Sequence, residues 1–124
     1  PWTDLANTGK SLETNADVDP IISKDLLDMM AAGYMGGKDP KTPLASPFYA
    51  DLNGLPPLLL QVGEPEGMVD DAKRFTEKAK AAGVDVTLEV WPDVPHIWPV
   101  FAPILPEGQQ ALDRAGEFFR KHTK

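Results

Sequence analysis

The sequence predicts an α/β fold in which parallel strands are joined by crossover helices. Residues 58–62 form a short apolar run bounded by Pro57 and Gly63. Residues 68–82 repeat apolar side chains at helical spacing, and residues 86–90 alternate apolar with polar ones. A strand, a helix of about thirteen residues and a second strand make the crossover unit of a parallel sheet. Two strands do not form a stable sheet by themselves, so we expect the sheet to be incomplete in this chain.

The composition of the 124 residues narrows the classes of partner. Lys and Arg number 12 and Asp and Glu 19, a formal charge of −7, which disfavours nucleic acid because phosphates require a basic surface. No apolar run approaches the roughly 20 residues that cross a bilayer. Without cysteine, the chain cannot form disulfides or sulfur-based zinc sites. The first residues lack the pattern of a signal peptide, and we favour a cytoplasmic location.

The first 57 residues predict one helix and long connections. Residues 1–19 show no strong periodicity. A helix is expected between Ser23, a suitable N-cap, and Gly36-Gly37, a suitable end. Four of its apolar residues recur at helical spacing, namely Leu26, Leu27, Met30 and Tyr34. Residues 38–57 are rich in proline and are expected to form a loop.

The second half supplies the expected sheet. The continuous run at 58–62 is typical of a strand that is buried on both faces. The helix that follows ends at Gly83, and the alternating strand at 86–90 is expected at an edge, where it could pair with a second copy in a homodimer. A last helix over 107–121 places four apolar residues on one face, which are Leu112, Ala115, Phe118 and Phe119.

Acidic residues and a histidine follow the two predicted strands. Glu64, Glu66 and Asp70 come after the first strand, and His96 comes after the second. The carboxyl ends of parallel strands meet at one edge of a sheet, where sites form. A carboxylate bonded to one imidazole nitrogen fixes the tautomer and leaves the other nitrogen free as a base. The alternatives are helix capping by the acids and a purely structural histidine.

Several spaced motifs resemble one enzyme family. Residues 46–52 (SPFYADL), 54–63 (GLPPLLLQVG) and 81–86 (AAGVDV) resemble the C-terminal part of hormone-sensitive-lipase-like esterases. These are α/β-hydrolases that cleave carboxylic esters. Pro95-His96, Trp98, Phe101 and residues 106–108 resemble the family's histidine region. The resemblance implies three units, which are a segment after a central strand (1–19), a cap helix and loop (20–45) and a strand–helix–strand–helix unit (46–124).

The resemblance implies roles for single residues. His96 is similar to the triad histidine, and Glu66 stands where the family places its triad acid. Glu64 is the alternative acid, because the residues around both depart from the family pattern. Asp70 resembles the residue that caps the following helix. Five further residues are implied as pocket lining or, alternatively, as helix core or wall, namely Met29, Met30, Tyr34, Trp98 and Phe101. Neither a metal nor a cofactor is implied.

The family also needs parts that this sequence does not show. A serine on a G-x-S-x-G turn and an upstream His-Gly-Gly-Gly loop complete such enzymes, and Ser11, Ser23 and Ser46 lack that glycine framing. We therefore expect the second half of an esterase, inactive by itself, whose partners are an ester substrate and the missing N-terminal part. The alternatives are a non-catalytic α/β binding or interaction module and a flavodoxin-like phosphate-binding domain. Four carboxylates near one helix start disfavour the phosphate-binding domain.

Overall fold

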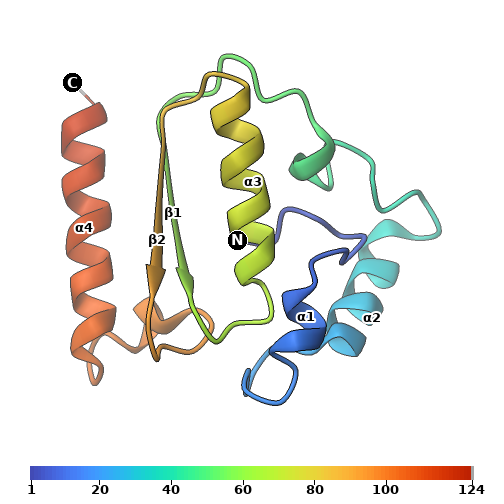
Figure 1. Ribbon diagram of the computed structural model, residues 1–124, viewed down its shortest axis with the longest axis horizontal. Helices are drawn as coiled ribbons and strands as arrows, with labels where there is room; N and C mark the ends of the chain where they lie inside the picture. The colour runs from blue at the N-terminus through green and yellow to red at the C-terminus, as the bar shows by residue number, and fades with distance from the viewer. Residues whose placement is uncertain (124) are drawn as a thin grey trace.

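The computed structural model describes residues 1–123 and shows two parallel strands between helices (Figure 1). Lys124, the last residue of the 46–124 unit, lies outside the described residues. The elements in chain order are α1 (Ser11–Thr14), α2 (Lys24–Met35), the 3₁₀ helix η1 (Pro47–Tyr49), β1 (Leu58–Gly63), α3 (Val69–Ala81), β2 (Val86–Trp91), η2 (Trp98–Phe101) and α4 (Pro106–His122).

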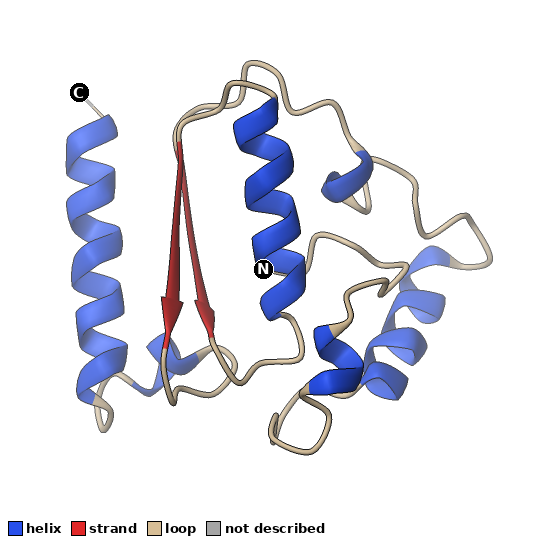
Figure 2. Cartoon of the chain, viewed as in Figure 1, coloured by secondary structure: helices blue, strands red, loops and turns tan. Residues whose placement is uncertain are grey.

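The sheet confirms the predicted fold class. β1 pairs with β2 in parallel, with Leu58 opposite Val86 and Gly63 opposite Trp91. Helix α3 lies on one side of the strands and α4 on the other (Figure 2). Both strands point the same way, so the loops that follow them lie at one end of the sheet. No third strand pairs with β1 or β2 within residues 1–123, as expected for an incomplete sheet.

The main core lies between α3 and the sheet. Phe75 of α3 is buried there, and removing a side chain of this size from water contributes about 1.5–3 kcal/mol. Gly83 follows α3 with φ of 77°, the left-handed conformation that stops a helix. The buried residues of this core are Leu52, Leu60, Val62, Val69, Ala72, Phe75, Ala79 and Val84.

Helix α2 begins and ends as predicted. The Ser23 hydroxyl accepts a hydrogen bond from the Leu26 N–H at 3.3 Å, and Gly36 ends the helix with φ of 55°. Of the four apolar residues expected at helical spacing, however, only Leu27 is buried. Leu27, Ala31 and Met35 face the core, whereas Tyr34 is 74% exposed. The buried stripe is shifted by one residue from the Leu26, Met30 and Tyr34 positions, because it packs against Leu5, Leu12 and Met68.

Two segments hold more structure than their sequences predict. Residues 11–14 form the short helix α1 in the segment without periodicity, and residues 47–49 form η1 within the predicted loop.

Of the helices in the described part of the chain, none combines the length and apolar character that crossing a membrane requires. The pairing of β2 with a second copy stays a prediction.

Candidate active site

Glu66 and His96 meet at the carboxyl end of the sheet. Glu66 lies on the loop after β1, and His96 lies on the loop after β2. The Oε2 atom of Glu66 is 2.6 Å from Nδ1 of His96, and its Oε1 atom accepts a hydrogen bond from the Gly63 N–H at 2.6 Å. Glu66 is 3% exposed, while the His96 side chain is 20% exposed. The carboxylate is therefore held on both oxygens, and the imidazole keeps Nε2 for another partner.

Glu64 lies near this pair but outside it. Its backbone N–H donates to the Trp91 carbonyl at 2.7 Å, which extends the contact between the two strands by one residue. Its side chain is exposed, whereas Glu66 is buried against His96. The structure thus brings Glu66, and not the alternative Glu64, into contact with His96.

Gly63 allows the two loops to approach each other. A Cβ atom at this position would lie 2.4 Å from the Val94 carbonyl oxygen and 3.1 Å from Oε1 of Glu66. Any larger residue would therefore push apart the loops that carry the acid and the histidine. Beside His96, the β-branched Ile97 has φ of 55°, a conformation that such residues rarely adopt and that stores strain.

Trp98 anchors the loop that carries His96 to helix α4. This side chain is 2% exposed and packs with Val94 and Ala111. Its Nε1 donates to the Glu107 carbonyl at 3.3 Å. Gly108 of α4 permits the close contact, since a Cβ there would lie 2.8 Å from the Trp98 carbonyl oxygen. The loop is therefore fixed to α4 immediately after the histidine.

A cleft of about 380 Å³ opens beside the Glu66–His96 pair. Leu59 and Leu60 line it along β1, and Trp98 lines it from η2. Glu66 and His96 also line this cleft. Among residues 1–123, no group of three or more His, Asp and Glu residues could hold a metal ion.

The implied pocket residues do not come together in this structure. Met30 and Tyr34 line a separate cleft with Trp2, whereas Trp98 lines the cleft of His96. Met29, which is exposed on α2, and Phe101, at the surface of η2, line neither cleft. The implied single pocket is thus not assembled by the described residues. All three α2 residues are exposed, so none of them packs into a core formed by the described residues.

Asp70 does not cap its helix, which corrects the implied role. Met68 occupies the N-cap position of α3, and no side chain caps the helix from there. Instead, the Ser11 hydroxyl accepts a hydrogen bond from the Asp70 N–H at 3.0 Å. The Asp70 carboxylate in turn accepts from the Ser11 N–H at 3.0 Å. The cap comes from a residue 59 positions away, so no local pattern predicts it.

Two buried carboxylates, Asp4 and Asp71, lie where the first residues meet α3, and the sequence pattern indicates a contact for neither of them. Asp71 accepts hydrogen bonds from the Thr3 N–H at 2.8 Å and the Asp4 N–H at 3.2 Å, and from the Thr3 hydroxyl. Burial raises the pKa of the Asp71 carboxyl by more than these bonds lower it. Burial also acts to raise the pKa of Asp4, but bonds from Thr8, Tyr49 and Ala6 outweigh it and lower that pKa.

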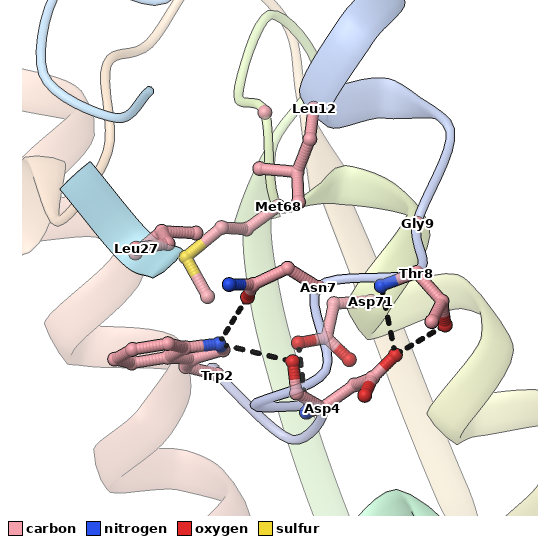
Figure 3. Close-up of a pocket in the computed structure, with 10 residues that line it drawn as sticks. Trp2, Asp4, Asn7, Thr8, Gly9, Leu12, Leu27, Met68 and Asp71 are labelled. Carbon is pink, nitrogen blue, oxygen red and sulfur yellow. Dashed lines mark hydrogen bonds between the residues drawn. The ribbon is translucent and has the colours of Figure 1, made fainter. Parts of the chain in front are cut away.

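Asp4 and Asp71 are among the residues that line a small cavity between the first residues and α3 (Figure 3). The Asp4 side chain points toward Thr8 there, and the Trp2 indole N–H points toward Asn7 and the Asp4 carbonyl. Asp4 and Asp71 stand 67 positions apart in the chain, so only the fold reveals their relationship.

Comparison with known proteins identifies the family. Residues 1–100 match the family described as the α/β-hydrolase fold. The chain belongs to the α/β-hydrolases. An acetyl-hydrolase of Streptomyces hygroscopicus is 46% identical over 99% of the chain and 41% of its own length. An esterase of Acinetobacter venetianus is 38% identical over 95% of the chain and 39% of its own length.

Solved structures agree with this assignment. The crystal structure of an esterase from the bacterial hormone-sensitive lipase family is 59% identical, with a TM-score of 0.98. The match covers all of this chain and 42% of that one. The resemblance to hormone-sensitive-lipase-like esterases is therefore confirmed. This α/β-hydrolase chain spans about two fifths of the length of the relatives it matches.

Proposed function

We propose that the full-length protein containing this chain is a serine carboxylic ester hydrolase, and that this chain supplies the acid and the histidine of its catalytic triad. The 2.6 Å contact between Oε2 of Glu66 and Nδ1 of His96 carries the proposal. It places an acid and an imidazole at the carboxyl end of a parallel sheet, beside a cleft. The names of the relatives, an acetyl-hydrolase and an esterase, support it.

The geometry suits a proton relay between a serine and its ester. Nε2 of His96 would remove the proton of the serine hydroxyl as that oxygen attacks the ester carbonyl, and would then return it to the leaving alkoxide. The Glu66 carboxylate would hold the Nδ1–H tautomer and stabilise the imidazolium that forms. Because Gly63 fixes the second carboxylate oxygen, the acid stays directed at the ring.

The serines of this chain serve other purposes. Ser11 bonds to the backbone at the start of α3, and Ser23 caps α2. Ser46 is fully buried, donates to the Pro40 carbonyl at 2.5 Å and accepts from the Leu5 N–H at 2.8 Å. The nucleophile and the oxyanion donors would therefore come from a part of the protein outside this chain. We expect the chain by itself to be inactive.

The test is hydrolysis of p-nitrophenyl acetate by the full-length protein. The relative named an acetyl-hydrolase makes this short ester the first choice. His96→Ala should lower kcat by about 10⁴-fold to 10⁶-fold, because the base is lost while the fold remains. Circular dichroism checks that the variant is folded. Turnover that is unchanged in folded His96→Ala would instead favour the non-catalytic binding module.

The acid is tested with a matched pair of variants. Glu66→Gln and Glu64→Gln make the same chemical change two residues apart, one on a buried side chain and one on an exposed one. Glu66→Gln should lower kcat by about 10⁴-fold, since an amide cannot stabilise the imidazolium, and Glu64→Gln should stay within about twofold of wild type. A larger loss at Glu64 would assign the acid to that residue.

A further inference from the structure

We infer that Asn15 and Asp19 are positioning residues for Glu66, and that they hold its loop so that the carboxylate meets His96. The inference rests on the proposed ester hydrolysis, in which Glu66 supports the base. Both residues stand in the segment between α1 and α2, about fifty positions before the acid. Their hydrogen bonds to this loop go to backbone atoms and not to His96, so both would act through the backbone around Glu66.

Asp19 joins two loops through one buried carboxylate. Its Oδ2 atom accepts a hydrogen bond from the Gly67 N–H, the peptide directly after Glu66, at 2.7 Å. Its Oδ1 atom accepts from the N–H groups of Ile21 and Ile22, both at 2.9 Å. Hydrogen bonds to a charged acceptor are stronger than those between neutral groups. The carboxylate therefore ties the acid's loop firmly to the approach to α2.

Asn15 holds the same loop from its carbonyl side. Its Nδ2 atom donates to the Glu66 carbonyl at 3.0 Å and to the Glu64 carbonyl at 3.3 Å. The Ser11 hydroxyl adds a bond to the Gly67 carbonyl at 2.5 Å. The backbone on both sides of Glu66 is thus fixed by side chains of residues 11–19.

Close packing leaves the loop little freedom to find another position. A Cβ atom at Gly67 would lie 3.2 Å from the Leu12 side chain and 3.6 Å from Oδ2 of Asp19. The Glu66 side chain, by contrast, bonds to groups at the strand ends, the Gly63 N–H and His96. A shift of its backbone would therefore change the distance to Nδ1. A misplacement of about 1 Å in a catalytic group can cost about 100-fold in rate.

The test compares variants of the full-length protein in p-nitrophenyl acetate hydrolysis. Asp19→Asn replaces one acceptor by a donor that faces backbone N–H groups, and Asn15→Ala removes both bonds to the acid's loop. Each should lower kcat by about 10-fold to 100-fold and leave KM within about twofold, because the segment lies behind the acid and outside the cleft lining. Asp17→Asn, the same change on an exposed side chain two residues away, is the control and should match wild type.

A second measurement separates positioning from general stability. The proton on His96 Nδ1, shared with Glu66, should give a downfield proton NMR line that weakens or moves upfield in Asn15→Ala and Asp19→Asn and not in Asp17→Asn. If Asp19→Asn does not fold, Asn15→Ala decides. A kcat within twofold of wild type, or an unchanged NMR line in the folded variants, would overturn the inference. A wild-type protein without esterase activity would refute the proposed function instead, and the NMR line would still test the positioning.

Discussion

The two halves of the chain are stabilised in different ways. In residues 58–123 most of the buried apolar side chains lie in two clusters. The main core of eight takes seven of its members from this half and only Leu52 from residues 1–57. A second cluster of Val94, Trp98 and Ala111 joins the His96 loop to α4.

The first half has two smaller clusters of three buried residues each, one of which includes Met68 from the second half. Phe48 also packs against the main core, and Arg74 of α3 lies over its ring. Many of the other links from the first half to α3 and to the Glu66 loop are hydrogen bonds made by buried polar side chains, above all Asp4, Asp19 and Asp71. The two strands bring Glu66 and His96 together, and the polar links bond to the backbone around Glu66.

The difference has an energetic consequence. The free energy gained by burying apolar side chains scales with the buried area. Truncating a core side chain therefore lowers the free energy of unfolding in proportion to the atoms removed. A buried hydrogen bond contributes less when it is made, but its loss leaves a donor or acceptor buried without a partner. We therefore expect damage to the core to be larger and global, and damage to the polar links to be smaller and local.

The largest expected effect is in the core. Phe75→Ala should lower the free energy of unfolding of the full-length protein by about 3–5 kcal/mol, because it leaves a cavity between α3 and the sheet. Phe119→Ala, the same change on an exposed residue of α4, should stay within about 0.5 kcal/mol of wild type. Urea unfolding measures both. Equal losses in the two variants would contradict the assignment of the core to α3 and the sheet.

A smaller and local effect is expected where the two halves join. Asp71→Asn should lower the free energy of unfolding by about 1 kcal/mol, because a neutral amide oxygen accepts weaker hydrogen bonds from the N–H groups of Thr3 and Asp4 than the carboxylate does. Hydrogen exchange should quicken at residues 3–8 and stay unchanged in β1 and β2. Asp85→Asn, on an exposed side chain, is the control. Faster exchange in the strands as well would show that the two halves unfold as one unit.

The smallest effect is expected from the loss of the ion pair between Glu89 of β2 and Arg114 of α4. Burial alone would raise the pKa of Glu89, but bonds from Arg114, Gln61 and Trp91 outweigh it and lower that pKa. A lowered carboxyl pKa adds stability that is present above the ordinary value, roughly pH 4, and is lost as the pH falls through the folded-state value. Glu89→Gln should therefore cost less than about 1 kcal/mol at pH 7.

That cost should disappear on acidification. Urea unfolding of wild type and Glu89→Gln between pH 7 and pH 3 measures it, and added salt should reduce it at pH 7 because Arg114 is exposed. A cost that grows as the pH falls would contradict the direction of the Glu89 shift.

The sequence predicted the regular elements and the order of the site residues. The apolar run before Gly63, the helical spacing that includes Phe75 and the alternation at 86–90 are local patterns, and each formed the expected element. The motif order also placed an acid after β1 and a histidine after β2, and parallel strands bring those ends together. Patterns of this kind predict elements correctly because the backbone geometry within a strand or helix depends on residues that are neighbours in the sequence.

Only the tertiary structure decided contacts between residues far apart in the chain. It selected Glu66 rather than Glu64 as the partner of His96, buried Ala31 and Met35 rather than Met30 and Tyr34, and gave the cap of α3 to Ser11. A local pattern states that a carboxylate or an apolar face is available, but not which neighbour it meets. That choice follows from packing, because burial and hydrogen-bond geometry are settled only when separate segments come together.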